Sequence, residues 1–218
     1  MKNQRNLIIA AHFDDEVLGC GGLLQGGDDN HVVIISESCS SRYTDHCRES
    51  ALATNKKEKI FKKMAEKYGY DSLFCGFADN QLDNLPLLIL VKHIESMIRD
   101  VRPSRVITHY EHDLNIDHQI VSQSVRTALR PGKHKTVKQL LEFEVLSSTE
   151  LSSVPFQPNW FLGMTCSRLQ EKMNMMNAYE TEINGVRKKA NIGAIARLRG
   201  CQCGFEYAEG YRSVFHYI

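Results

Sequence analysis

The sequence predicts a single α/β domain, a Rossmann-like three-layer αβα sandwich with a mostly parallel sheet. Short apolar runs typical of buried strands alternate with longer amphipathic segments typical of helices. Repeats, low-complexity tracts and linker-like stretches are all missing from the sequence, so we expect one domain over residues 1–218. With 42% hydrophobic and 24% charged residues, the composition is that of a soluble protein with a sizeable core.

The expected elements follow in order along the chain. Apolar runs predict strands at residues 6–11, 31–36, 72–76, 104–108 and 140–147. Helical periodicity predicts helices at residues 17–25, 50–70, 87–101, 117–129, 169–179 and 192–199. The helix at 50–70 is expected to end at Gly69, and Pro103 stops the next helix. The polar stretch 37–55 is expected to be a long loop.

Charge and cysteine usage narrow the class of protein. The net charge of +1 creates no overall field for nucleic acid or an anionic membrane. The lysines at 56, 57, 59, 62 and 63 are interspersed with Glu58 and Glu66, which favours a solvated helix face. The longest apolar run, 85–91, is too short to cross a bilayer. The seven cysteines are odd in number, and the first residues lack a signal-peptide core, so we expect a cytoplasmic protein with free thiols.

Acidic and histidine side chains follow two of the expected strands. His12, Asp14 and Asp15 come after the first strand, and the stretch 109–118, HYEHDLNIDH, follows the fourth. Ligands of open α/β sheets bind beyond the carboxyl ends of the strands. A divalent metal would explain both loops, because His and Asp suit zinc and the spacing His-x-x-Asp lets two ligands meet one ion. The alternative is that the acids only cap a helix and favour its dipole.

The segment 10–22, AAHFDDEVLGCGG, closely resembles the AHPDDE-x-L-G-x-G-G signature of the LmbE/PIG-L-like zinc-dependent N-deacetylases. The stretch 112–118, HDLNIDH, is similar to the downstream Asp-His pair of that family. Weaker similarities follow in the family's order at GFADNQLD (76–83), FEVLSSTE (143–150) and RGCQCGFEYAEGY (199–211). The resemblance therefore covers nearly the whole chain.

The resemblance implies roles for individual residues. His12, Asp15 and His118 match the three zinc ligands, and Asp14 matches the general base that activates water. Asp117 matches the acid that orients neighbouring catalytic groups. The family often contacts its sugar substrate at the position of Asp79.

Two positions depart from the family pattern. Phe13 replaces the usual proline, which leaves the turn freer but removes no chemical group. Asn115 stands where many members carry a histidine, and an amide can donate to an oxyanion but cannot deliver a proton. His112 or His109 would then protonate the leaving amine, and we favour His112.

The resemblance implies a hydrolase that removes an N-acetyl group from a small amino-sugar-containing substrate and uses Zn²⁺. The alternatives are a zinc-dependent amidohydrolase acting on a non-sugar amide, or a binding protein that has kept the fold. Arg42 and Arg48, in the expected loop after the second strand, are candidates for binding a phosphate or carboxylate of the substrate. No nucleic-acid or membrane partner is expected, and a homo-oligomer is left open.

Overall fold

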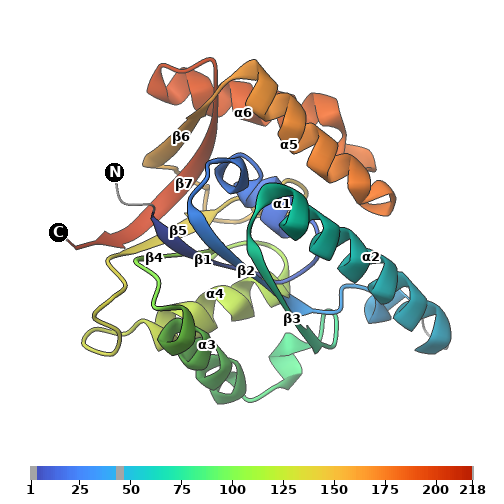
Figure 1. Ribbon diagram of the computed structural model, residues 1–218, viewed down its shortest axis with the longest axis vertical. Coiled ribbons are helices and arrows are strands. Elements are labelled where there is room, and N and C mark those ends of the chain that lie inside the picture. The colour runs from blue at the N-terminus through green and yellow to red at the C-terminus, as the bar shows by residue number, and fades with distance from the viewer. Residues whose placement is uncertain (1–3, 43–46, 218) are drawn as a thin grey trace.

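The computed structural model describes residues 4–42 and 47–217, which form one seven-stranded sheet in the order β3-β2-β1-β4-β5-β7-β6 (Figure 1). Strands β1 to β5 pair in parallel, whereas β7 runs antiparallel to both β5 and β6. The predicted fold class is therefore confirmed. The strands are β1 (Arg5–Ala10), β2 (Asp29–Ser36), β3 (Asp71–Phe77), β4 (Arg105–His109), β5 (Gln139–Phe143), β6 (Trp160–Met164) and β7 (Tyr207–His216).

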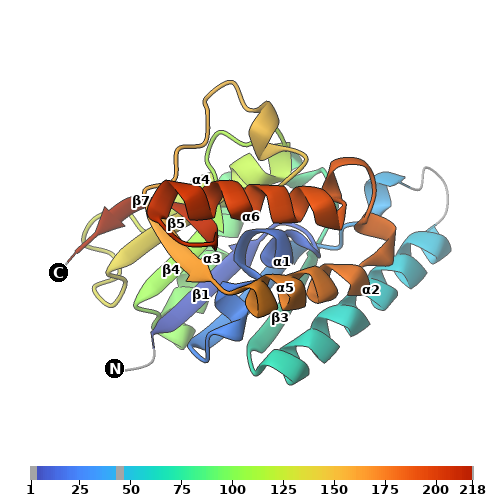
Figure 2. The same ribbon diagram turned by 90° about the horizontal axis from the view of Figure 1, so that it is seen from above.

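Helices cover both faces of the sheet (Figures 1 and 2). One face packs on α1, α2, α5 and α6, and the other packs on α3 and α4. Alternate residues of β1 serve the two layers: Ile8 and Ala10 pack on the first, Leu7 and Ile9 on the second. The helices are α1 (Asp15–Cys20), α2 (Cys47–Tyr68), α3 (Leu87–Val101), α4 (Ile116–Ala128), α5 (Cys166–Ala178) and α6 (Lys189–Cys203).

The structure differs from the sequence expectations mainly after residue 143. Strand β5 ends at Phe143 rather than continuing to residue 147, and the following residues turn into a short 3-10 helix, Thr149–Leu151. The strands β6 and β7 were not expected. Helix α2 begins at Cys47, inside the stretch expected as a loop, so the loop after β2 is shorter than predicted.

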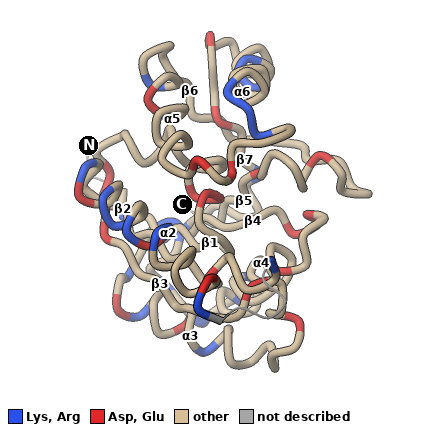
Figure 3. Tube along the Cα trace, turned by 90° about the vertical axis from the view of Figure 1, so that its right-hand side faces the viewer, with Lys and Arg blue, Asp and Glu red and all other residues tan. Residues whose placement is uncertain are grey.

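Charged residues of both signs are interspersed along the trace (Figure 3). Of the five lysines expected on a solvated face of α2, four are exposed, but Lys57 is buried. None of the helices in the described ranges combines the length and the apolar character needed to cross a membrane.

Candidate active site

Three donor atoms converge where β1 and β4 end. His12 Nδ1 lies 3.3 Å from Asp15 Oδ2 and 3.2 Å from His118 Nε2, and His118 Nε2 lies 3.2 Å from Asp15 Oδ2. His12 and Asp15 follow β1, while His118 lies in the first turn of α4, which follows β4. Because β1 and β4 are parallel neighbours, their carboxyl ends meet at this point. The structure thus brings together the three predicted metal ligands.

The spacing and chemistry of these atoms fit a tetrahedral zinc ion. Two ligands about 2.0–2.1 Å from such an ion lie about 3.3 Å apart, close to the separations found here. Asp15 Oδ1 is buried and has no hydrogen-bond partner among the described residues. Two imidazoles and a carboxylate are a ligand set that catalytic zinc uses, with one position left for water. We therefore regard the triad of His12, Asp15 and His118 as a candidate metal site.

Further carboxylates face the outer ring nitrogens of His12 and His118, which are the nitrogens that point away from the triad. His12 Nε2 lies 3.1 Å from Asp117 Oδ2 and 3.2 Å from Asp79 Oδ1. His118 Nδ1 lies 3.0 Å from Asp113 Oδ1. A carboxylate at the outer nitrogen holds the ring proton there, so the inner nitrogen is left to bind a metal. Asp117 lies where the sequence placed an orienting acid, whereas Asp113 was not singled out.

The titration of the triad reflects how closely its charges are packed. Burial alone would raise the pKa of Asp15, but His118 and His12 outweigh burial and hold that pKa well below its usual range. Burial alone would lower the pKa of His12, but the carboxylates of Asp117, Asp15 and Asp79 raise it well above its usual value. The site therefore favours positive charge between these carboxylates, as a metal ion would supply.

Asp14 lies beside the triad and is held in an unusual conformation. Its φ of 102° and ψ of −28° belong to a region that residues other than glycine rarely adopt. Its side chain makes no capping hydrogen bond to α1. Burial raises the pKa of Asp14 to about 7, with Arg187 opposing this effect. A carboxylate with a pKa near neutrality, next to a metal site, is well suited to accept a proton.

A cavity of about 250 Å³ opens over the triad. The predicted residues His12, Asp14, Asp79, Asn115 and His118 all line it. Three further charged residues in the lining, Lys57, Glu182 and Arg187, were not expected from the sequence. Glu182 and Arg187 come from the connection between α5 and α6, far from the motifs in the sequence, so no local pattern could have revealed them.

Glu182 holds two of the cations at the cavity wall. Arg42 donates two hydrogen bonds to the Glu182 carboxylate, at 2.8 and 2.9 Å, and Lys57 Nζ lies 2.8 Å from the same group. Arg42 lines the cavity, but its guanidinium is already engaged by Glu182, and its expected role in binding an anionic substrate group stays a prediction. Arg48 is exposed in the first turn of α2 and is not among the residues that line the cavity.

The two candidate proton donors lie away from the cavity. His112 is exposed, with Nε2 3.8 Å from Glu111, and the described lining residues do not include it. The general-acid role expected for His112 therefore has no support in this geometry. His109 is fully buried, stacks on His118 and accepts a hydrogen bond from the backbone N–H of Ala11. His109 therefore contacts the site through the His118 ring and the backbone of Ala11, on the side away from the cavity.

Asn115 is the N-cap of α4. Its side-chain oxygen accepts hydrogen bonds from the backbone N–H groups of Asp117 and His118, at 2.9 and 3.3 Å. The amide oxygen is therefore committed to the helix that carries two site residues. The amide nitrogen is left as the group that could donate into the cavity.

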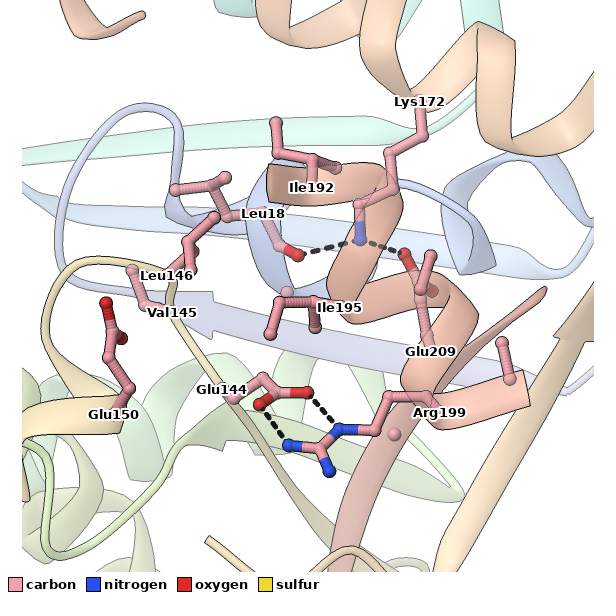
Figure 4. Close-up of a pocket in the computed structure, with 14 residues that line it drawn as sticks. Leu18, Glu144, Val145, Leu146, Glu150, Lys172, Ile192, Ile195, Arg199 and Glu209 are labelled. Carbon is pink, nitrogen blue, oxygen red and sulfur yellow. Dashed lines mark hydrogen bonds and ion pairs between the residues drawn. The ribbon is translucent and has the colours of Figure 1, made fainter. Parts of the chain in front are cut away.

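A buried ion pair between Lys172 and Glu209 contacts the short helix α1 (Figure 4). Lys172 Nζ donates to the carbonyl oxygen of Leu18 at 2.7 Å and lies 2.6 Å from Glu209 Oε1. Glu209 also accepts hydrogen bonds from the N–H groups of Gly22 and Leu23. Leu18, Lys172 and Glu209 border a second, smaller cavity of about 50 Å³ with mainly apolar walls. The ion pair ties α5 and β7 to the helix that begins with Asp15.

The sequence of this chain matches a known protein family over more than half of its length. Residues 7–129 match the family model described as PIG-L: GlcNAc-PI de-N-acetylase. A probable N-acetyl-alpha-D-glucosaminyl L-malate deacetylase 2 of Bacillus cereus is 29% identical over 134 residues, which cover 56% of this chain and 60% of the relative. The match thus spans less than two thirds of that relative's length.

Two solved structures of similar fold are named for different reactions. N,N'-diacetylchitobiose deacetylase from Pyrococcus horikoshii is 16% identical, with a TM-score of 0.72, over 97% of this chain and 84% of that one. GalB, the 4-carboxy-2-hydroxymuconate hydratase of Pseudomonas putida KT2440, is 22% identical, with a TM-score of 0.76, over 99% and 98%. These likenesses show the fold, while the family model covers more than half of the chain, and the protein therefore belongs to the PIG-L family of deacetylases.

Proposed function

We propose that this protein is a zinc-dependent hydrolase that removes an N-acetyl group from a small amino-sugar-containing molecule, with Asp14 as general base. The observation that carries the proposal is that Asp14 lines the same cavity as His12 and His118, two members of the triad that Asp15 completes. When bound, zinc supplies Lewis-acid polarisation of the acetyl carbonyl and makes a water molecule more acidic.

Asp14 and Asn115 are the residues of this chain that we assign to proton transfer and to oxyanion stabilisation. Asp14 accepts the proton of the attacking water, and its pKa of about 7 lets it pass that proton on to the leaving amine. In this proposal Asp14 therefore takes the protonation step expected of His112, which is exposed and does not line the cavity. The side-chain nitrogen of Asn115 can donate a hydrogen bond to the developing oxyanion, because only its oxygen is used by the α4 cap.

The rest of the cavity lining supports a polar, sugar-like substrate. Asp79 is held by Ser41 and lies in the wall beside Asn80, so its carboxylate can accept hydrogen bonds from sugar hydroxyls. Arg42 reaches an anionic substrate group only if it gives up part of its pairing with Glu182. The B. cereus relative is named for a malate conjugate of N-acetylglucosamine, which would supply such a group.

Acetate release tests the proposal. The zinc-loaded protein is assayed with N-acetylglucosamine, a nucleotide-linked form, its malate conjugate, diacetylchitobiose and an N-acetylated non-sugar amine. We expect acetate from at least one sugar, loss of activity after chelation, and recovery with zinc. His118→Ala should lose zinc and activity together, whereas the exposed His216→Ala should keep both.

Three outcomes would contradict parts of the proposal. If only the N-acetylated non-sugar amine released acetate, the substrate would be a non-sugar amide rather than an amino sugar. Zinc binding without acetate from any compound would point to a different reaction or to a binding role. Turnover of 4-carboxy-2-hydroxymuconate instead would indicate the hydratase chemistry for which GalB is named.

A further inference from the structure

The connection between α5 and α6 brings three side chains to the candidate active site. Tyr179 follows α5, Glu182 ends the 3-10 turn Glu180–Glu182, and Arg187 ends the turn Gly185–Arg187. All three are well covered from solvent, with side-chain exposure of 4% for Glu182 and 19% for Arg187. This connection lies outside residues 7–129, the part of the chain that the family model matches.

Arg187 bridges the proposed base and the opposite cavity wall. Its Nη1 lies 2.5 Å from Asp14 Oδ2. Its Nε donates to Ser147 Oγ at 2.9 Å and to the carbonyl oxygen of Leu146 at 3.3 Å. Because the guanidinium is planar, these bonds fix the direction from which Nη1 meets the carboxylate. The bond uses Oδ2, and no described residue bonds Oδ1, which is therefore the oxygen available to the cavity.

Tyr179 is linked to the backbone of Asp14 through the side chain of Glu16. Its hydroxyl donates to Glu16 Oε1 at 2.8 Å, and Glu16 Oε2 accepts the backbone N–H of Asp14 at 2.9 Å. Glu16 is fully buried, so this chain of bonds is shielded from water. The bonds hold the positive φ of Asp14, a strained conformation that persists only when its surroundings enforce it.

We propose that the connection from Tyr179 to Arg187 is a clamp that positions Asp14 for proton transfer. Arg187 holds its carboxylate, and Tyr179 holds its backbone through Glu16. The proposal rests on the function proposed above and adds positioning residues from a part of the chain that the family motifs do not include. Its physical basis is that a base contributes fully only when its free lone pair is fixed toward the reacting proton.

Kinetics separate positioning from binding. Arg187→Ala should keep equimolar zinc and lower kcat about 100-fold, with KM little changed, because Asp14 is misplaced while the other charged lining residues, Arg42, Lys57 and Glu182, remain. Free guanidinium ions should restore about a tenth of the lost activity by occupying the vacated position. Arg187→Lys should recover little, since one ammonium group cannot bridge Ser147 and Asp14. Tyr179→Phe should lower kcat about tenfold.

The matched control is Arg197→Ala. Arg197 lies in α6, the helix that follows the connection, and its side chain is 58% exposed. It lies 3.6 Å from Glu206 and over the ring of Tyr207, and it is not among the residues that line the cavity. It should leave kcat unchanged. Wild-type kcat in Arg187→Ala, or a change in KM alone, would overturn the clamp.

A stability measurement tests the clamp without any substrate. Thermal midpoints are compared for Asp14→Asn, Arg187→Ala and the double variant. If Arg187 holds Asp14, the double variant should lose less than the sum of the two single losses. Additive losses would show that the two side chains are not coupled. If the wild type released no acetate from any compound, the function proposal would fail, and this cycle would still decide whether the contact exists.

Discussion

Asp14, Asp15 and Glu16 are consecutive acids that the fold assigns to different tasks. Burial raises the pKa of Glu16 to about 8 and that of Asp14 to about 7, whereas the two histidines hold the pKa of Asp15 well below its usual range. The difference comes from their partners, because Asp15 faces imidazoles and Glu16 faces Tyr179. The helix-cap alternative loses support, since the Asp14 side chain makes no capping bond.

Asp113 should control metal affinity without touching the metal. It faces His118 Nδ1 at 3.0 Å and is itself held by Ser148 and Thr149. Asp113→Ala is expected to weaken zinc binding about 10–100-fold, because the imidazole loses the partner that fixes its proton and orientation. Competition with a chelator measures the affinity, and the exposed Asp100→Asn is the control. Equal zinc affinity in the variant and the wild type would refute this role.

The sequence indicated the three side chains that the structure brings together as a candidate metal site, and it singled out Asp117 beside them, but it did not indicate Asp113 or Arg187. The spacing His-x-x-Asp pointed to His12 and Asp15, whereas the family resemblance selected His118 among the histidines of residues 109–118. Arg187 lies 173 residues beyond Asp14 along the chain, and such a pairing exists only once the fold is formed. The sequence pattern predicted that Lys57 is solvated like the neighbouring lysines of α2. In the structure Lys57 is buried and pairs with Glu182, which comes from a distant part of the chain.

At the scale of elements, α4 depends on Asn115 for its start. The side-chain oxygen of Asn115 accepts two backbone N–H groups, including that of the metal ligand His118. Asn115→Ala should lower the free energy of unfolding by about 1 kcal/mol, measured by urea titration.

Asn115→Asp distinguishes the cap from catalysis. Aspartate caps a helix about as well as asparagine, so stability should be kept, but it loses the amide N–H proposed for the oxyanion. We expect kcat to fall about 10–100-fold in Asn115→Asp. Unchanged kcat with unchanged stability would leave Asn115 with a capping role alone.

The elements of the parallel part of the sheet were predictable because each strand is a short apolar run. Strand β7 reads YAEGYRSVFH, which mixes charges and a glycine with apolar residues. Its Glu209 is nevertheless buried, because Lys172 and two backbone N–H groups satisfy it. Partners from other elements make the charge tolerable there, and the hydrophobic pattern of one strand cannot show them.

At the scale of the whole molecule, the site lies where the strand order changes direction. From β1 the chain proceeds through β2 to β3, and then returns to place β4 on the other side of β1. Ligands of open α/β sheets bind in the crevice outside the carboxyl ends of strands at such a point. The C-terminal third of the chain then closes this crevice, since Glu182 and Arg187 reach it from the connection between α5 and α6.

Glu182 links that connection to the first half of the chain and should make stability depend on pH. Burial alone would raise its pKa, but hydrogen bonds from Arg42 and Lys57 lower it to about 2. A lowered pKa means that the stabilisation is complete above the unfolded value of about 4.5 and is lost as pH falls toward 2. Arg187 and Asp14 also face this carboxylate and set its surroundings.

Glu182→Gln tests this linkage. The variant should be less stable than the wild type by about 2–3 kcal/mol at pH 7, and the difference should shrink between pH 4.5 and 2 as the wild-type carboxyl is protonated. Urea midpoints at several pH values measure the difference, with the exposed Glu66→Gln as control. A difference that stays constant with pH would contradict the shifted titration.

The proposed function requires that one metal ion and Asp14 act together on an N-acetyl group. The most direct measurement is zinc content and acetate release in the same preparations of wild type, Asp14→Asn and the exposed control Asp100→Asn. We expect about one zinc per chain in all three, and a loss of kcat of about 10²–10⁴-fold in Asp14→Asn alone. Near wild-type acetate release by zinc-loaded Asp14→Asn would show that Asp14 is not the general base.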